Sequence, residues 1–280
     1  TPLYSSAASD VYKRQTNDGS IDADGSGVNV LSGGNVYMTG PDGTIDAVDN
    51  GIRMITTNGN VDIIDPGTIN ATNGSGVVGA TLNGATTITT NKTVTATNGN
   101  GVYGASINGD TNVTTNDLVS VTNGEFGAAA SAVNGNATVT INGGIDPPNI
   151  GGSAIAVNGN STIVVNNDPV FNVEANNIGL FGANFGSGKI SITNNGETID
   201  SGGAGIVAAK IGAAVDPITG DPLPESIVIQ NLGGRIEADG VGISVTAADP
   251  NSILDPANAV VNNVRILSLI HISEPTRPRL

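Results

Sequence analysis

The stretch "GSGVVGATLNGATTITTNKTVTATN", residues 74–98, is followed directly by "GNGVYGASINGDTNVTTNDLVSVTN", residues 99–123. The two segments have the same length, about 25 residues, and align position by position without a gap. A fixed period of this size indicates a repeat architecture in which each repeat packs on its neighbours. Within each segment, three short runs alternate apolar and polar residues, which is the pattern of a strand with one buried face.

The same three kinds of run recur in the same order along most of the chain. The first kind includes "GSGVNV" at Val28, the second "NVYM" at Val36, and the third "GTIDA" at Ile45. Asn-Gly and other glycine-rich breaks separate the runs, and no stretch carries a 3.6-residue apolar stripe. The sequence therefore predicts an all-β fold, a right-handed, single-stranded parallel β-helix (a β-solenoid) of about nine coils. Each coil would have roughly 25 residues and three short strands.

Stacked coils predict columns of equivalent side chains. We expect two aliphatic columns and one ladder of hydrogen-bonded asparagines at a turn. The first column contains Ile21, Ile45, Ile69, Val94 and Val119, the second contains Val28, Ile52, Val77 and Val102, and the ladder contains Asn83, Asn108, Asn134 and Asn158.

The two ends of the chain differ from the rest in composition. "SSAASDVYKRQ", residues 5–15, and "LSLIHISEPTR", residues 267–277, resemble translated sequencing-library adapters. We therefore interpret residues 1–15 and 267–280 as non-native tails and residues 16–266 as an internal β-solenoid fragment of a longer protein. The single histidine, His271, belongs to the second tail. A proline-bearing insertion, residues 213–226, interrupts one coil.

Composition excludes several classes of function. The chain has ten Lys and Arg, 25 Asp and Glu, and a net charge of −15. Without the tails the charge is 6 − 23 = −17, and no Cys, His or Trp remains. This excludes Ser–His–Asp and Cys–His catalysis and His/Cys metal sites. It also argues against nucleic acid or an anionic membrane as a partner. We expect no catalytic residue, no cofactor and no metal.

One acidic turn is a candidate for calcium. "DGSIDADGSG", residues 18–27, resembles a calcium loop through Asp18, Asp22 and Asp24. An EF-hand loop would supply a bidentate Glu at its twelfth position, which is Asn29 when counted from Asp18. We therefore expect these residues to be solvated turn acids.

Acidic pairs are the candidates for polysaccharide chemistry, which needs two facing carboxyl groups. The nominal pairs are Asp22 with Asp24, Asp46 with Asp49, and Asp62 with Asp65, and none has a nearby basic or aromatic partner in the sequence. Polar residues instead recur at one coil position, which predicts a solvent-facing row: Asp22, Asp46, Asn70, Asp200 and Glu237.

Contact sites are predicted from aromatic residues and from the insertion. The large aromatic residues are Tyr103, Phe126, Phe171, Phe181 and Phe185. Phe181 and Phe185 would form a contact patch if exposed; the alternative is that aromatic side chains cap the interior of the core. The insertion 213–226 is the leading candidate for a binding loop, and a passive surface loop is the alternative.

"GTINATNGSGVVGA", "KTVTATNGNGVYGA" and "ETIDSGGAGIVAA" resemble the passenger repeats of Gram-negative autotransporter adhesins, and also filamentous-haemagglutinin-type adhesins. The resemblance covers most of residues 16–266. It implies a non-catalytic structural or adhesive stalk, secreted or displayed outside the bacterial cell. Its partners would be a host-cell, matrix or glycan surface and the neighbouring coils of the parent chain, with no membrane contact by this fragment.

Two alternatives stay open, a polysaccharide-active β-helix enzyme and a viral or phage fibre module. A groove with clustered acidic and basic residues would favour the enzyme, and tight lateral trimer contacts would favour the fibre. An even, polar surface with one protruding loop would favour the adhesin.

Overall fold

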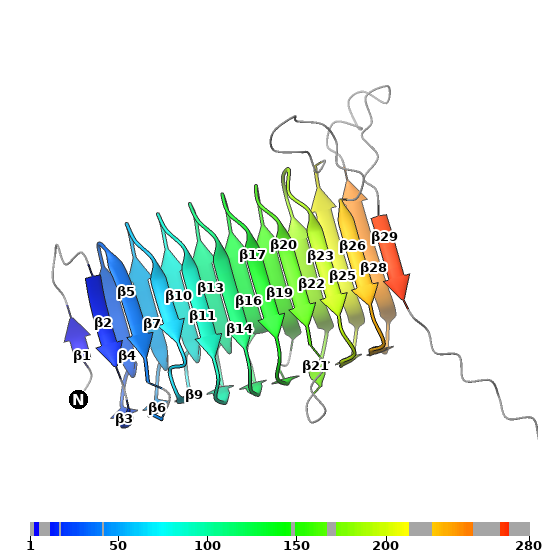
Figure 1. Cartoon of the computed structure of the whole chain (residues 1–280). Helices are drawn as coiled ribbons and strands as arrows, with labels where there is room; N and C mark the ends of the chain where they lie inside the picture. Colours follow the sequence, from blue (N-terminus) through cyan, green and yellow to red (C-terminus); the bar gives the residue numbers. More distant parts are fainter. Residues whose placement is uncertain are drawn as a thin grey trace, which may run out of the picture.

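The computed structural model describes residues 3–5, 12–16, 18–40, 42–146, 149–166, 172–212, 226–248 and 264–268. These residues form three sheets of parallel strands, which wind as a β-solenoid (Figure 1). The described residues contain no helix that is long and apolar enough to cross a membrane.

Every coil contributes one strand to each sheet. The first sheet contains β1 (Leu3–Ser5), β4 (Val28–Ser32), β7 (Ile52–Thr56), β10 (Val77–Thr81), β13 (Val102–Ser106), β16 (Phe126–Ala132), β19 (Ile150–Ala156), β22 (Ile178–Asn184), β25 (Ala204–Ile211) and β28 (Val241–Ala248). The second contains β2 (Tyr12–Thr16), β5 (Asn35–Thr39), β8 (Val61–Ile64), β11 (Thr86–Thr90), β14 (Thr111–Thr115), β17 (Ala137–Ile141), β20 (Ser161–Val165), β23 (Ile190–Asn194), β26 (Ile227–Asn231) and β29 (Val264–Ser268). The third contains β3 (Ser20–Ala23), β6 (Thr44–Ala47), β9 (Thr68–Ala71), β12 (Val94–Ala96), β15 (Val119–Val121), β18 (Ile145–Asp146), β21 (Val173–Ala175), β24 (Thr198–Ser201) and β27 (Arg235–Ala238).

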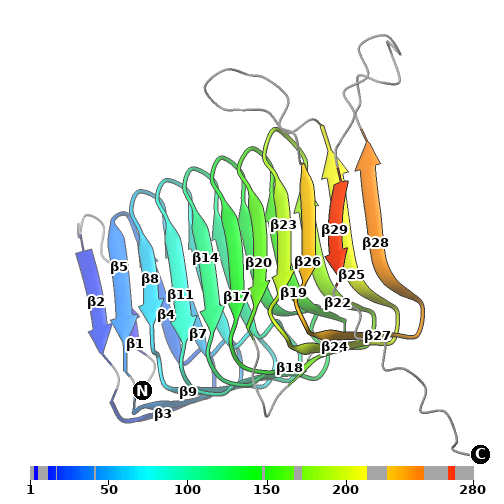
Figure 2. The ribbon, with the colours of Figure 1, turned by 45° about the vertical axis from the view of Figure 1, so that its right-hand side comes forward.

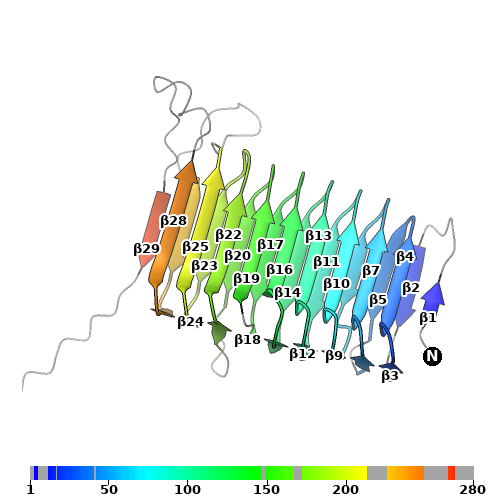
Figure 3. The same cartoon turned by 180° about the vertical axis from the view of Figure 1, so that it is seen from behind.

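The predicted architecture is confirmed. Each strand pairs in parallel with the strand three places along the chain, so equivalent positions of successive coils lie side by side (Figures 2 and 3). The sheets of the described part contain ten, ten and nine strands, slightly more than the nine coils predicted. Parallel crossovers strongly prefer the right hand, which is the hand predicted for this coil.

The additional strands lie at the ends of the solenoid. β1 and most of β2 fall within residues 1–15, and β29 extends into the segment that begins at residue 267. An open coil presents unpaired N–H and C=O groups to which an adjoining segment can pair. Such pairing uses only backbone groups, so it does not depend on the origin of the segment.

The predicted aliphatic columns form the core. In the third sheet, Ile45 is in register with Ile69, and Ile69 with Val94. In the first sheet, Ile52 is in register with Val77, and Val77 with Val102. All of these side chains are fully buried. The interior therefore repeats nearly the same layer in each coil, which explains the periodicity of the sequence.

Asparagine ladders run along all three corners of the solenoid. At the predicted ladder, the Nδ2 of Asn108 donates to the Oδ1 of Asn83 (2.7 Å), and Asn134 and Asn158 each donate to the preceding member (2.8 Å). Side-chain amides are linked in the same way at the other two corners, in one ladder of Asn73, Asn98 and Asn123 and another of Asn91, Asn116, Asn142, Asn166 and Asn195. The exposed corners are thus tied from coil to coil by side chains as well as by backbone.

In most coils a glycine directly precedes the strand of the first sheet, because a Cβ at this position would have no space. A Cβ at Gly76 would overlap the Cγ1 of Val94 and lie 2.8 Å from the carbonyl oxygen of Gly101. A Cβ at Gly51 would meet Ile69 in the same way. The buried side chain from the third sheet, Val94 or Ile69, fills the space that a Cβ would need.

Candidate functional site

The predicted row of polar residues on the third sheet is confirmed. Asp22 is in register with Asp46, and Asp46 with Asn70. Both aspartates are exposed, and the Oδ1 of Asp46 accepts a hydrogen bond from the Nδ2 of Asn70 (2.7 Å). Asp46 is therefore part of a coil-to-coil contact.

The acidic turn that contains Asp18, Asp22 and Asp24 lies at one end of the third sheet. Within the part of the chain that the structure describes, no group of three or more His, Cys, Asp and Glu is arranged to hold a metal ion. The three acids occupy exposed positions at and around β3, as expected for solvated acids.

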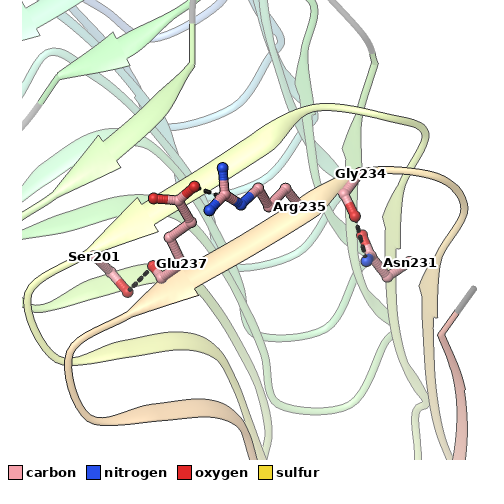
Figure 4. A network of polar contacts seen from close by, with 5 residues as sticks. All are labelled: Ser201, Asn231, Gly234, Arg235 and Glu237. Atoms are coloured by element: carbon pink, nitrogen blue, oxygen red, sulfur yellow. Dashed lines mark hydrogen bonds and ion pairs between the residues drawn. The ribbon is translucent and has the colours of Figure 1, made fainter. Parts of the chain in front are cut away.

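At the other end of this row, Asp200 is in register with Glu237, and Glu174 with Asp200. Figure 4 shows that Glu237 also contacts Arg235 of the same strand, at 2.6 Å between Oε1 and Nε. The Oγ of Ser201 donates to the carbonyl oxygen of Glu237 (3.5 Å). Arg235 is largely exposed, so this ion pair contributes little to stability.

The pair Asp62 and Asp65 is divided between a strand and the turn after it. Asp62 faces outward from β8. Its partial burial raises the pKa of its carboxyl group, and a hydrogen bond with the Thr87 side chain acts in the opposite direction and lowers this pKa. Asp65 follows the strand with a left-handed backbone (φ 49°). Asp62 is thus hydrogen-bonded to a hydroxyl group, and this contact does not provide the second carboxyl group that glycoside hydrolysis needs.

The described aromatic side chains lie outside the core columns. Tyr103 and Phe181 face outward from the first sheet and are half-buried, as is Phe126 at the start of β16. Phe185 is 47% exposed, so the alternative that it caps the core interior is wrong. Phe171 and residues 213–225 of the insertion lie outside the described residues, and Ser226 is buried directly before β26.

The structure reveals a surface that the sequence analysis missed, the outward face of the first sheet. Between β7 and β19 this face is hollowed into a groove of about 510 Å³. In-register small residues, Ala80, Ala105 and Ser131, line its floor. Ile55 and Ile155 occupy the same position in the coils at either end.

An exposed apolar row follows the corner between the first and second sheets, and four of its six members also line the groove. Its members occupy the same place in successive coils, and those measured as exposed are 38–47% accessible. We define the apolar row as Leu82, Ile107, Val133, Val157, Phe185 and Ile211. The outward positions of the second sheet are instead mostly polar, as Thr87, Thr89, Asn112 and Thr114 show.

The sequence contained a signal for this face. In the first kind of run, as in "VVGAT" and "VYGAS", the positions that should alternate to polar hold Val, Tyr and Ala. In the second kind of run of the same two coils, the outward positions hold Thr and Asn, so in these coils the first kind of run departs from polar alternation.

A buried polar corner lies behind the apolar row. The hydroxyls of Thr56, Thr81 and Ser106 each donate a hydrogen bond to the carbonyl oxygen of a glycine in the preceding coil (2.6–2.7 Å). This glycine lies at the corner between the first and second sheets. At the equivalent position of β25, Lys210 is fully buried, and its Nζ donates to the Oδ1 of Asn184 (2.7 Å) and to the carbonyl oxygen of Gly186. Burial lowers the pKa of Lys210 to about 8.

The described geometry thus supplies a regular rod with two largely polar faces and one apolar face that carries a groove. Comparison with models of protein families, with curated proteins and with solved structures gave no match to this chain.

Proposed function

We propose that this chain is a structural and adhesive stalk segment of a bacterial surface or secreted adhesin, similar to an autotransporter passenger. It would act outside the cell and without catalysis. The observation that carries the proposal is the unbroken stack of coils, each paired in register with the next along three sheets. At the usual strand spacing, ten stacked strands span roughly 43 Å.

Such a stack suits a spacer because its length depends only on the number of coils. Each coil contacts its neighbours alone, so coils can be added without a new core. Asparagine ladders at all three corners reinforce the exposed edges. The net charge of −15 keeps the rod soluble and disfavours anionic partners. A host-cell, matrix or glycan surface is the partner class that this role requires.

The adhesive role can be tested by display of the full chain on a non-adherent bacterium. Cells are counted after flow over immobilised fibronectin, collagen and a panel of glycans. We expect retention on at least one coating above cells that display nothing. The matched control is Ile69→Asp, which places a charge in the core column and should abolish retention with the fold. Equal retention of all cells on every coating would refute the adhesive role.

A second candidate, a viral or phage fibre module, is favoured by the apolar face of the first sheet, because fibres need lateral contacts between chains. The even, polar surface expected of an adhesin is not what the first sheet presents. The molar mass of the purified chain separates the two candidates, since a stable trimer would favour the fibre.

A further inference from the structure

We propose that two copies of this chain associate through the outward face of the first sheet. Their solenoid axes lie side by side and run in the same direction. The inference rests on the charge, shape and area of that face, and it does not depend on the adhesive role.

Charge distinguishes the first sheet from the rest of the molecule. Nine of its strands, β4 to β28, contain no Asp or Glu, although the chain has 25 of them. Their two cations are Arg53, which donates to Asn29 (3.2 Å), and Lys210, which is buried on the inner side. Depletion of charge at the centre of a patch is characteristic of the core of a protein interface.

The shape of the face is complementary to itself. The groove floor at Ala105 and the apolar row at Ile107 are two residues apart, about 7 Å along the strand direction. Consider a two-fold axis that is parallel to the solenoid axis and lies midway between these two positions. It places the groove floor of each copy opposite the apolar row of the other. The row of each copy then enters the groove of the other, and the strand repeat matches every layer to its equivalent. A self-complementary two-fold contact is the commonest form of protein association.

The area of the face is sufficient for a stable pair. Nine strands extend for roughly 38 Å, and a width of six residues gives roughly 20 Å, so the face covers about 750 Å². A stable interface buries about 800 Å² on each partner.

The arrangement also reduces repulsion between two acidic chains. The acidic row lies on the third sheet, and Asp62 lies on the second, so neither is on the contacting face. Charges separated by more than about 8 Å are largely screened at physiological ionic strength. Added salt should therefore strengthen the pairing of two copies, whereas it would weaken the binding of a cationic partner to this acidic chain.

Sedimentation of the full chain over a wide range of concentration, at low and high salt, tests the proposal. We expect a monomer–dimer equilibrium that shifts toward dimer as salt increases. Ile107→Asp places a charge in the groove of the partner, and should raise the Kd by at least about 100-fold. The matched control, Asn112→Asp, adds the same charge to the second sheet of the same coil and should change the Kd by less than about threefold. Circular dichroism establishes that both variants fold.

The relative direction of the copies is tested by disulfide formation, since the chain has no cysteine of its own. A mixture of Ala105→Cys and Ile107→Cys chains should form more cross-linked dimer than either chain alone, because the two-fold axis brings these positions together. A monomer at every concentration, a trimer, a dimer indifferent to Ile107→Asp, or no preference for the mixture would overturn the proposal. Retention of displayed cells is measured separately, so failure here leaves the adhesive role standing.

Discussion

Replacement of Gly76 by alanine tests the close packing between the first and third sheets. The added Cβ would overlap the Cγ1 of Val94 and approach the carbonyl oxygen of Gly101 to 2.8 Å. Val94 is fully buried and lies in register between Ile69 and Val119, so its side chain has little room to move. The carbonyl oxygen belongs to the backbone of the next coil and cannot turn aside.

The expected destabilisation is about 3 kcal/mol, the upper part of the usual range for an overpacked core, because both neighbours are fixed. Val94→Ala alone removes two methyl groups from the buried column and should cost about 2 kcal/mol. The double variant should cost about 3–4 kcal/mol rather than the sum of about 5, since the smaller side chain admits the new Cβ. The difference is a coupling of about 1–2 kcal/mol between Gly76 and Val94.

Urea unfolding followed by circular dichroism measures all four members of this cycle. Gly33→Ala is the matched control, because a Cβ at Gly33 meets nothing within 4 Å. Its free energy of unfolding should stay within about 0.5 kcal/mol of the parent value or rise slightly. Strict additivity of Gly76→Ala and Val94→Ala would refute the steric explanation, as would an equal loss of stability in Gly33→Ala.

Three further predictions concern polar side chains. Asn108→Asp removes the donor to Asn83 and places a carboxylate next to the Oδ1 of Asn83. The free energy of unfolding at neutral pH, measured by urea unfolding, should therefore fall by about 1–2 kcal/mol. It should recover in acid, where the carboxyl group is protonated and can donate. Because the pKa of Lys210 is lowered from 10.5 to about 8 in the folded chain, the unfolded chain binds more protons between these values. Stability should therefore rise by up to about 3 kcal/mol from pH 8 to 10.5 relative to Lys210→Met, and a parallel pH profile for the two chains would contradict this. Asp200→Asn removes the repulsion between Asp200 and its two in-register neighbours, Glu174 and Glu237. Thermal unfolding should show a gain in stability of about 0.2–1 kcal/mol at low salt and no gain at high salt.

The sequence was sufficient to predict most of the fold. Parallel sheets, three strands in each coil, the aliphatic columns and the Asn83 ladder follow from equivalent residues one repeat apart, and all are confirmed. The candidate surface was not predicted, because alternation was attributed to all three kinds of run alike. Aromatic residues were considered one by one, although Tyr103 is in register with Val78, and Phe181 with Val207, on the same outward face.

The amino-acid sequence by itself determined the stacking of the coils, because in-register pairing brings each residue against its equivalent one period away. Only the tertiary structure decided which contacts join different strands of one coil, such as Gly76 with Val94, and that Lys210 is fully buried. It also decided that small residues at Ala80, Ala105 and Ser131 leave a groove beside the apolar row. The physical reason is that space and solvent exposure depend on side chains from several strands and coils at once, which a one-dimensional period does not contain.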